Sequence, residues 1–173
     1  MMNESILNNK TLLAVDDEPD IIEMLEELIF AEAPKCAIDR ATTYEEACEL
    51  LASYTYDLVI LDIMGVRGFD LLKVATDRPN PIPTVMLTAH VFSPESFKRS
   101  VELGARAYLP KVKLISIVPF LEDVLTYEYG HTWRRILKSV EGIFTRSWGP
   151  YWRNPDSDFW DTFEKKIGKK SED

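Results

Sequence analysis

Two short apolar runs of this sequence end in carboxylates. Residues 58–61 (LVIL) are followed at once by Asp62, and residues 11–15 (TLLAV) are followed by Asp16 and Asp17. Four consecutive apolar residues without alternation are too few for a helix, and they predict a strand that is buried on both faces of a parallel sheet. Binding and catalytic sites in open α/β sheets lie at the carboxyl ends of the strands, which is where these acids would be.

Two further runs end in a hydroxyl and in an amine. Thr88 follows residues 84–87 (TVML), and Lys111 follows residues 107–109 (AYL) and one proline. In a sheet with the strand order 2-1-3-4-5, the first, third, fourth and fifth strands are neighbours, so all of these side chains would converge on one crevice. Several carboxylates suit a hard divalent cation such as Mg²⁺, and a lysine beside a hydroxyl suits a phosphoryl group. The combination predicts a phosphoryl-transfer site.

The acids also have a simpler interpretation. Asp62 can be an ordinary aspartate that opens a loop, and the acids after the first run can form a solvated turn in which Pro19 or Asp20 caps the next helix. Asp16, Asp17 and Glu18 follow one another directly, however, and like charges at that spacing destabilise one another. A compensating cation is therefore expected nearby.

The periodicity of the apolar residues predicts five βα units. The expected strands are residues 11–15, 36–38, 58–61, 84–87 and 107–109. The expected helices are residues 21–33, 43–51, 69–74, 94–103 and 114–127. Five such units in succession imply right-handed crossovers and a parallel sheet with helices on both faces.

Composition places the chain among globular proteins. The sequence is 46% hydrophobic and 28% charged, and no apolar run approaches the roughly 20 residues that a membrane span needs. Residues 1–9 are polar and are expected to be flexible, and they lack the apolar core of a secretory signal, so we expect a cytoplasmic protein. Cys36 and Cys48 lack the close spacing of metal or redox motifs and are expected to be buried thiols.

Charge and aromatic content divide the chain in two. From His131 to the end, nine Lys or Arg residues stand against seven Asp or Glu residues, whereas the whole chain has a net charge of −9. All four tryptophans lie in the same C-terminal part. We therefore predict a domain at residues 10–129 and a helical extension at residues 130–173. The overall acidity argues against non-specific nucleic-acid binding.

The extension is predicted to form two short helices. Residues 133–144 carry an apolar stripe at helical spacing, and a second stripe follows the Asn154-Pro155 pair up to Ile167. Exposed stripes of this size would mark an interaction surface, so we expect them to be buried on the fourth or fifth helix of the domain or across a homodimer. The extension can also be a purely stabilising element, or a helix at a membrane surface. No helix-turn-helix pattern is present, which argues against a DNA-binding output.

Over residues 10–127 the sequence resembles the receiver domain of bacterial two-component response regulators. The segments that carry the resemblance are LLAVDDEPD, YDLVILDIM, TVMLTAH and GARAYLPK. The resemblance implies a doubly wound, flavodoxin-like α/β fold with a five-stranded parallel sheet ordered 2-1-3-4-5. It also implies that Asp62 accepts a phosphoryl group from a sensor histidine kinase, a phosphotransfer protein or a small phosphodonor.

The same resemblance assigns the metal ligands. Asp17 would bind Mg²⁺ directly, and Asp16 would hold it largely through water. Asp62 and the backbone carbonyl of Met64 would complete the protein ligands.

The resemblance also assigns the groups that respond to phosphorylation. Thr88 would bond the phosphoryl oxygens, Lys111 would pair with them, and Tyr108 would be the aromatic switch of the family. Tyr108 can also be a core residue. His90 lies where the family tunes dephosphorylation, and it can also be a loop residue that faces solvent.

Two features depart from the family pattern. The loop after the phosphoacceptor, residues 63–68, is about two residues shorter than is common and lacks a proline. In the family, proline usually follows the lysine in a cis peptide bond, whereas here Pro110 precedes Lys111 and Val112 follows it. These departures affect the two loops that border the expected site.

The sequence therefore predicts a phosphoacceptor response regulator whose chemistry is limited to phosphorylation and autodephosphorylation at Asp62. We expect it to act through protein contacts, with a downstream partner at its fourth and fifth helices or at the extension, or with a second copy of the chain in a homodimer. The alternative is a phosphorylation-independent interaction module on the same fold. A phosphohydrolase would need a second acid, which the sequence does not place.

Overall fold

The protein forms a five-stranded parallel sheet with helices on both faces. The computed structural model describes residues 3–89 and 93–168. The strands are ordered β2-β1-β3-β4-β5, as predicted. Their bounds are β1 (Thr11–Val15), β2 (Ala37–Ala41), β3 (Leu58–Asp62), β4 (Thr84–Thr88) and β5 (Ala107–Pro110).

Register brings the ends of the inner strands to one edge of the sheet. Every residue of β3 and of β4 is buried, which explains why their sequences are apolar without alternation. Asp62 of β3 pairs with Leu87 of β4, and Thr88 of β4 pairs with Pro110 of β5. The side chains that follow these strands therefore share the carboxyl edge of the sheet.

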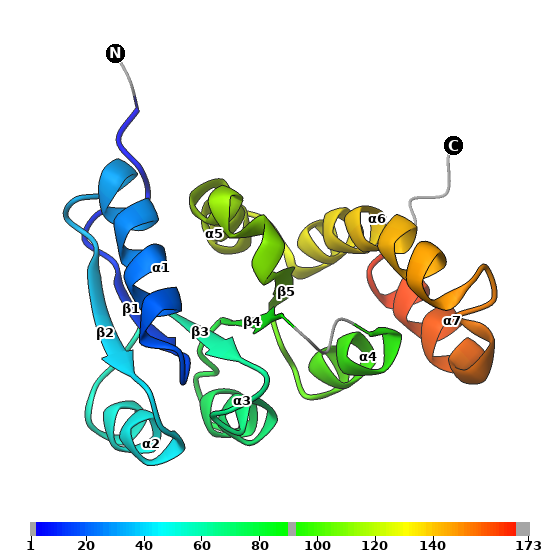
Figure 1. Cartoon of the computed structure of the whole chain (residues 1–173), viewed down its shortest axis with the longest axis horizontal. Coiled ribbons are helices and arrows are strands. Elements are labelled where there is room, and N and C mark those ends of the chain that lie inside the picture. Colours follow the sequence, from blue (N-terminus) through cyan, green and yellow to red (C-terminus); the bar gives the residue numbers. More distant parts are fainter. Residues whose placement is uncertain (1–2, 90–92, 169–173) are drawn as a thin grey trace.

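The helices of the five βα units form two layers. In Figure 1, α1 (Pro19–Glu32) and α5 (Ile117–Thr126) cover one face of the sheet. The other face is covered by α2 (Tyr44–Ser53), α3 (Gly68–Thr76) and α4 (Pro94–Glu102). This is the doubly wound architecture that the sequence predicts.

Local signals start two of these helices where the sequence indicated. The side chain of Thr43 accepts a hydrogen bond from the backbone N–H of Glu46 and caps α2. At α4, Ser93 and Ser96 form a reciprocal capping box, and Pro94 occupies the first turn.

The fifth helix begins later than predicted. Residues Lys111–Ser116 form a 3₁₀-helix, η1, and the α-helix starts only at Ile117. Pro119 explains the difference because proline has no N–H to bond the preceding turn. It interrupts a helix that starts at residue 114 but fits the first turn of one that starts at Ile117.

The C-terminal extension is helical, as predicted, and lies beyond the edge strand β5 (Figure 1). It contains α6 (Tyr129–Trp148), a short 3₁₀ turn η2 (Asn154–Asp156) and α7 (Ser157–Lys166). α6 contacts β5 and α5, so it covers the outer side of the sheet edge. The first of the two helices is longer than the sequence analysis anticipated.

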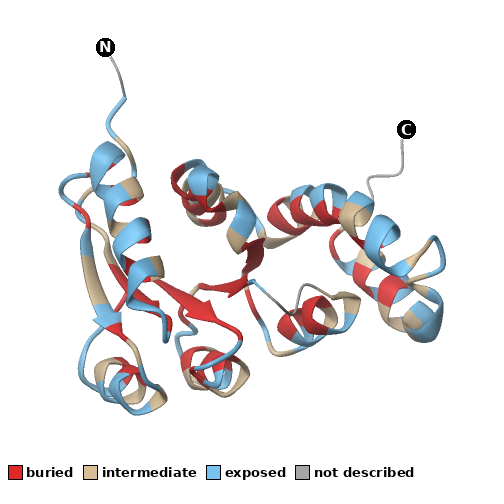
Figure 2. Ribbon diagram, viewed as in Figure 1, coloured by how far each residue is buried: buried red, intermediate tan, exposed pale blue. Residues whose placement is uncertain are grey.

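An aromatic cluster holds the extension against α4. Phe97 of α4 is fully buried, and its ring centroid lies 5.2 Å from that of Trp133 and 5.5 Å from that of Trp160. Phe144 and Phe163 also contact the Phe97 ring at 6.0 and 5.9 Å. The pairs with Trp133, Phe144 and Phe163 are edge-to-face, and pairs of this kind stabilise by about 0.5–1.5 kcal/mol beyond the burial of their surface. Figure 2 shows the buried sides of α4, α6 and α7 facing one another.

Gly130 has a packing role in the structure. The predicted boundary between the domain and the extension lies at this residue, and α6 begins one residue earlier, at Tyr129. A Cβ atom on Gly130 would lie 2.7 Å from the backbone carbonyl oxygen of Ile167. The first turn of α6 therefore approaches the end of α7 too closely for any side chain, and Arg134 adds hydrogen bonds to the carbonyls of Ile167 and Gly168.

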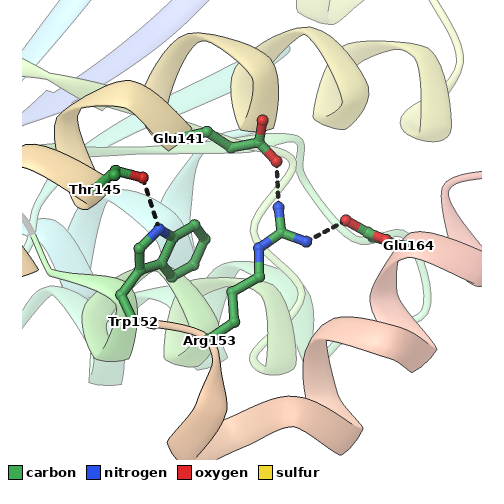
Figure 3. A network of polar contacts seen from close by, with 5 residues as sticks. All are labelled: Glu141, Thr145, Trp152, Arg153 and Glu164. Atoms are coloured by element: carbon green, nitrogen blue, oxygen red, sulfur yellow. Dashed lines mark hydrogen bonds and ion pairs between the residues drawn. The ribbon is translucent and has the colours of Figure 1, made fainter. Parts of the chain in front are cut away.

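A polar network closes the outer part of the extension (Figure 3). Arg153 forms ion pairs with Glu141 of α6 and Glu164 of α7. The indole N–H of Trp152 donates to the hydroxyl of Thr145 at 3.2 Å. A hollow of about 560 Å³ beside this network is larger than the pocket at Asp62. Because Arg153, Glu141 and Glu164 are already paired with one another, we assign no chemistry to this hollow.

The N-terminal segment makes contacts in the structure. Leu7 is fully buried, and the hydroxyl of Ser5 donates to Glu122 of α5 at 2.6 Å. The flexibility that we expected for residues 1–9 stays a prediction. Among the described residues, no helix is both long and apolar enough to span a bilayer.

Candidate phosphoryl-transfer site

Lys111 lies between two carboxylates at the carboxyl edge of the sheet. Its Nζ atom is 2.8 Å from Oδ2 of Asp16 and 3.1 Å from Oδ1 of Asp62. All three side chains are at least nine-tenths buried. This is the compensating cation that the successive acids required. The amine reaches the acids although Pro110 precedes the lysine, and no peptide bond among the described residues is cis.

Asp17 completes a group of three acids. Side-chain oxygens of Asp16, Asp17 and Asp62 all lie within 4.8 Å of one another. Asp16 and Asp62 are buried, whereas Asp17 is exposed at the mouth of the site. Three carboxylates against one ammonium group leave a surplus of negative charge, which suits a divalent cation with oxygen ligands.

A pocket of about 170 Å³ opens over these acids. Its wall contains Thr88 from the end of β4 and Met64 from the loop after β3. The backbone carbonyl of Met64 accepts a hydrogen bond from Val66 at 2.9 Å, and a carbonyl oxygen has a second lone pair for another partner. The donor set fits a hard cation such as Mg²⁺.

Burial disfavours the negative charges of this site. It raises the pKa of Asp62 to about 6, and the charge of Asp16 acts in the same direction while Lys111 opposes it. Burial also raises the pKa of Asp16. Asp62 is therefore mostly ionised at neutral pH, as a carboxylate nucleophile must be.

Lys111 keeps its charge in this setting. Burial alone would lower its pKa, but the hydrogen bond to Asp16 and the charge of Asp62 outweigh burial and raise it. A lysine held charged beside Asp62 can neutralise the oxygens of an incoming phosphoryl group.

Thr88 in the wall of the pocket lies beside Tyr108 of β5. The Thr88 hydroxyl is buried and lies close to the phenol of Tyr108, whose pKa it lowers. Burial outweighs this effect and raises the pKa of Tyr108 to about 12. The phenol oxygen lies 2.7 Å from the hydroxyl oxygen of Ser96 in α4.

Sequence reasoning missed two residues that shape this region. Ser96 was not singled out, although its position three residues after Ser93 is the signal for a capping box. Gly65 lies in the loop of residues 63–68, which the sequence analysis described only by its length, and its close approach to Asp17 could not be seen from spacing. His90 lies outside the described residues. His131 contacts the ring of Tyr127, with centroids 4.3 Å apart.

Comparison with known families decides the family to which this fold belongs. The sequence matches the response regulator receiver domain family over residues 12–117. This chain belongs to that family. The match covers the five strands except for Thr11 at the start of β1, and it covers the acidic group. It ends at the first residue of α5, so the extension lies beyond it. In this family, receiver domains are typically non-enzymatic apart from phospho-aspartate chemistry, and they imply a histidine kinase as partner.

Curated relatives of this receiver domain are longer proteins. Response regulator GtcR of Aneurinibacillus migulanus is 37% identical over 83 residues, which are 47% of this chain and 33% of GtcR. Sensory transduction protein LytR of Staphylococcus haemolyticus is 39% identical over 105 residues, which are 59% of this chain and 39% of LytR. The chain thus spans well under half the length of these relatives.

Solved structures of receiver domains share the fold. The receiver domain of Francisella response regulator 1452 is 26% identical, with a TM-score of 0.56 over 66% of this chain and 98% of that one. A response regulator from Hahella chejuensis has a TM-score of 0.60 at 24% identity, over 68% of this chain and 96% of that one. At this identity the second structure supports the fold alone.

Proposed function

We propose that this receiver domain accepts a phosphoryl group on Asp62 in a Mg²⁺-dependent reaction and signals through protein contacts. The donor is a sensor histidine kinase, a phosphotransfer protein or a small phosphodonor. One observation carries the proposal: the Lys111 ammonium group contacts both Asp16 and Asp62 in a pocket that Thr88 also lines.

The chemistry follows from the groups in the pocket. An oxygen of the ionised Asp62 carboxylate attacks phosphorus, and the bond from phosphorus to the donor nitrogen or oxygen breaks, with its electron pair leaving on the donor. No general base is needed because the nucleophile is already deprotonated. Lys111 pairs with the phosphoryl oxygens, and the buried hydroxyl of Thr88 donates to one of them.

Asp16, Asp17, Asp62 and the carbonyl of Met64 are the groups that would hold Mg²⁺. When bound, the ion supplies positive charge where negative charge develops on the transferred group. The surplus of two carboxylate charges over Lys111 supports this assignment.

We propose protein contacts rather than DNA binding as the output. The extension occupies the side of α4 that contains Phe97, and Tyr108 links α4 to the neighbourhood of Thr88. A change at the phosphoryl site would therefore reach α4 and the extension first. A downstream partner would bind at the α4 and α5 side or at the extension, with a homodimer as one form of such binding. Turnover is limited to the protein's own phosphorylation and dephosphorylation.

Incubation with acetyl phosphate and Mg²⁺ tests the proposal. We expect a phosphate-affinity gel to show one shifted species that is acid-labile, and the Asp62→Asn protein to show none. The Lys111→Ala protein should still be phosphorylated, because Asp62 forms the bond to phosphorus. Its conformational response to phosphorylation should be weaker, because Lys111 contacts the phosphorylated product. Unphosphorylated wild-type protein after this treatment would instead support the phosphorylation-independent interaction module.

A further inference from the structure

We propose that Gly65 is a positioning residue for Asp17, and that its missing side chain leaves the space in which the Asp17 carboxylate lies. The inference rests on the proposed Mg²⁺ site only for its functional consequence. Gly65 belongs to the shortened loop between β3 and α3, which is where this sequence departs from the common family pattern.

The contact between these two residues is unusually close. A Cβ atom built on Gly65 would lie 2.3 Å from Cγ of Asp17 and 2.4 Å from each of its carboxylate oxygens. A carbon atom does not approach a heavy atom to which it is not bonded this closely. Gly65 also has a φ of +77°, which favours glycine. Any other residue at this position therefore requires either the loop or Asp17 to move.

The loop itself has little freedom to withdraw. Val66 is buried, and the N–H of Gly68 donates to the carbonyl of Ile63 at 3.2 Å. A Cβ atom on Gly68 would lie 2.0 Å from the backbone carbonyl oxygen of Asp62, so the start of α3 is pressed directly against the end of β3. The short loop is thus fixed at both of its ends.

Asp17 is the group that can yield. Its side chain is exposed, and the colliding atoms are at the far end of that side chain rather than in the backbone. A side chain at position 65 should therefore turn the Asp17 carboxylate away from Asp16 and Asp62 and leave the fold in place. Because Lys111 already pairs with those two acids, losing Asp17 halves the surplus negative charge that attracts a divalent cation.

Calorimetric titration with MgCl₂ tests this consequence in the full chain. We expect Gly65→Ala to weaken Mg²⁺ binding at least tenfold, close to the effect of Asp17→Asn. Gly149→Ala is the matched control, because Gly149 also has a positive φ, of +79°, but a Cβ atom there would meet nothing within 4 Å. The control should bind Mg²⁺ like the wild-type protein. Wild-type affinity in Gly65→Ala would overturn the inference.

A crystal structure of metal-free Gly65→Ala separates this inference from the proposed function. We expect the Asp17 carboxylate to be displaced while Asp16, Asp62 and Lys111 stay in place, and an undisplaced Asp17 would overturn the inference. If the wild-type protein failed to bind Mg²⁺, the metal assignment would fall, and this structure would still decide the positioning role. Should Gly65→Ala not fold, adding Asp17→Ala should restore folding by removing the obstructing carboxylate, and failure to do so would also overturn it.

Discussion

The hydroxyl oxygens of Ser96 and Tyr108 lie 2.7 Å apart and connect α4 to β5. Tyr108 is also close to the Thr88 hydroxyl at the phosphoryl site, and its ring contacts Phe97 with centroids 5.3 Å apart. Phe97 in turn contacts the aromatic residues of the extension. A single buried tyrosine therefore lies between the candidate site and the C-terminal helices.

Tyr108→Phe should destabilise the protein by about 1 kcal/mol, the usual effect of losing one hydrogen bond. The effect should stay moderate because the Ser96 hydroxyl keeps its bond to the carbonyl of Ser93. Urea denaturation measures the change. Tyr151→Phe is the control, since Tyr151 is 75% exposed. Equal stability of the two variants would argue against a structural role for the Tyr108 hydroxyl.

Phe97→Ala should cost about 3–5 kcal/mol of unfolding free energy, the range for truncating a buried aromatic residue. The side chain is fully buried and is surrounded by rings of the extension. Phe30→Ala, at a residue that is 39% exposed, provides the comparison and should cost far less. Denaturation followed by tryptophan emission checks both variants. If they were equally stable, the cluster would not be what holds the extension to α4.

The beryllofluoride phosphoryl mimic with Mg²⁺ should shift the tryptophan emission, because every tryptophan lies in the extension and Trp133 contacts Phe97 of α4. Asp62→Asn should abolish the shift. Trp148→Phe removes the signal of a side chain that is 56% exposed and so sharpens the measurement. Unchanged emission together with an unchanged oligomeric state by light scattering would indicate that the extension only stabilises the fold.

Mg²⁺ should raise the melting temperature of the wild-type protein, because a ligand that binds only the native state adds about 2.7 kcal/mol at a hundredfold excess over its Kd. Asp17→Asn should lose most of this rise. Asp161→Asn, in an exposed part of α7, should keep it. The same rise in Asp17→Asn as in the wild-type protein would show that Asp17 is not a metal ligand.

In the absence of metal, the free energy of unfolding should decrease as the pH rises from about 4 to about 6. The pKa of Asp62 is raised from 3.8 to about 6 in the folded protein, so the native state binds this proton more tightly than the unfolded chain does. The stabilising contribution of protonated Asp62 is complete below its pKa in the unfolded chain and is lost as the pH rises through its pKa in the folded protein. Each pKa unit corresponds to about 1.4 kcal/mol, which limits the effect of Asp62 to about 3 kcal/mol.

Asp16 acts in the same direction because burial also raises its pKa. Urea denaturation in EDTA at several pH values measures the combined effect. Asp62→Asn should flatten the pH dependence, whereas Asp161→Asn should leave it unchanged. A wild-type stability that rose across this window would contradict the assignment.

The sequence by itself determined the sheet and the composition of the site. Uninterrupted apolar runs at β3 and β4 predict strands buried on both faces, because such strands have no polar side to expose. The polar residue after each run then lies at the carboxyl edge, so Asp16, Asp62 and Thr88 could be grouped before any contact was known. The start of α5 was less accurate because Pro119 acts on a single turn, which an average over the apolar pattern does not resolve.

Only the tertiary structure decided which residues surround this site and how the site contacts α4 and the extension. The collision between a Cβ at Gly65 and Asp17, the bond from Ser96 to Tyr108 and the packing of Trp133 on Phe97 all join residues that are distant in sequence. Periodicity tells which side of an element is buried, but it does not tell which other element covers that side. That choice depends on loop lengths and on how side chains fill the space between helices, and these are properties of the whole fold.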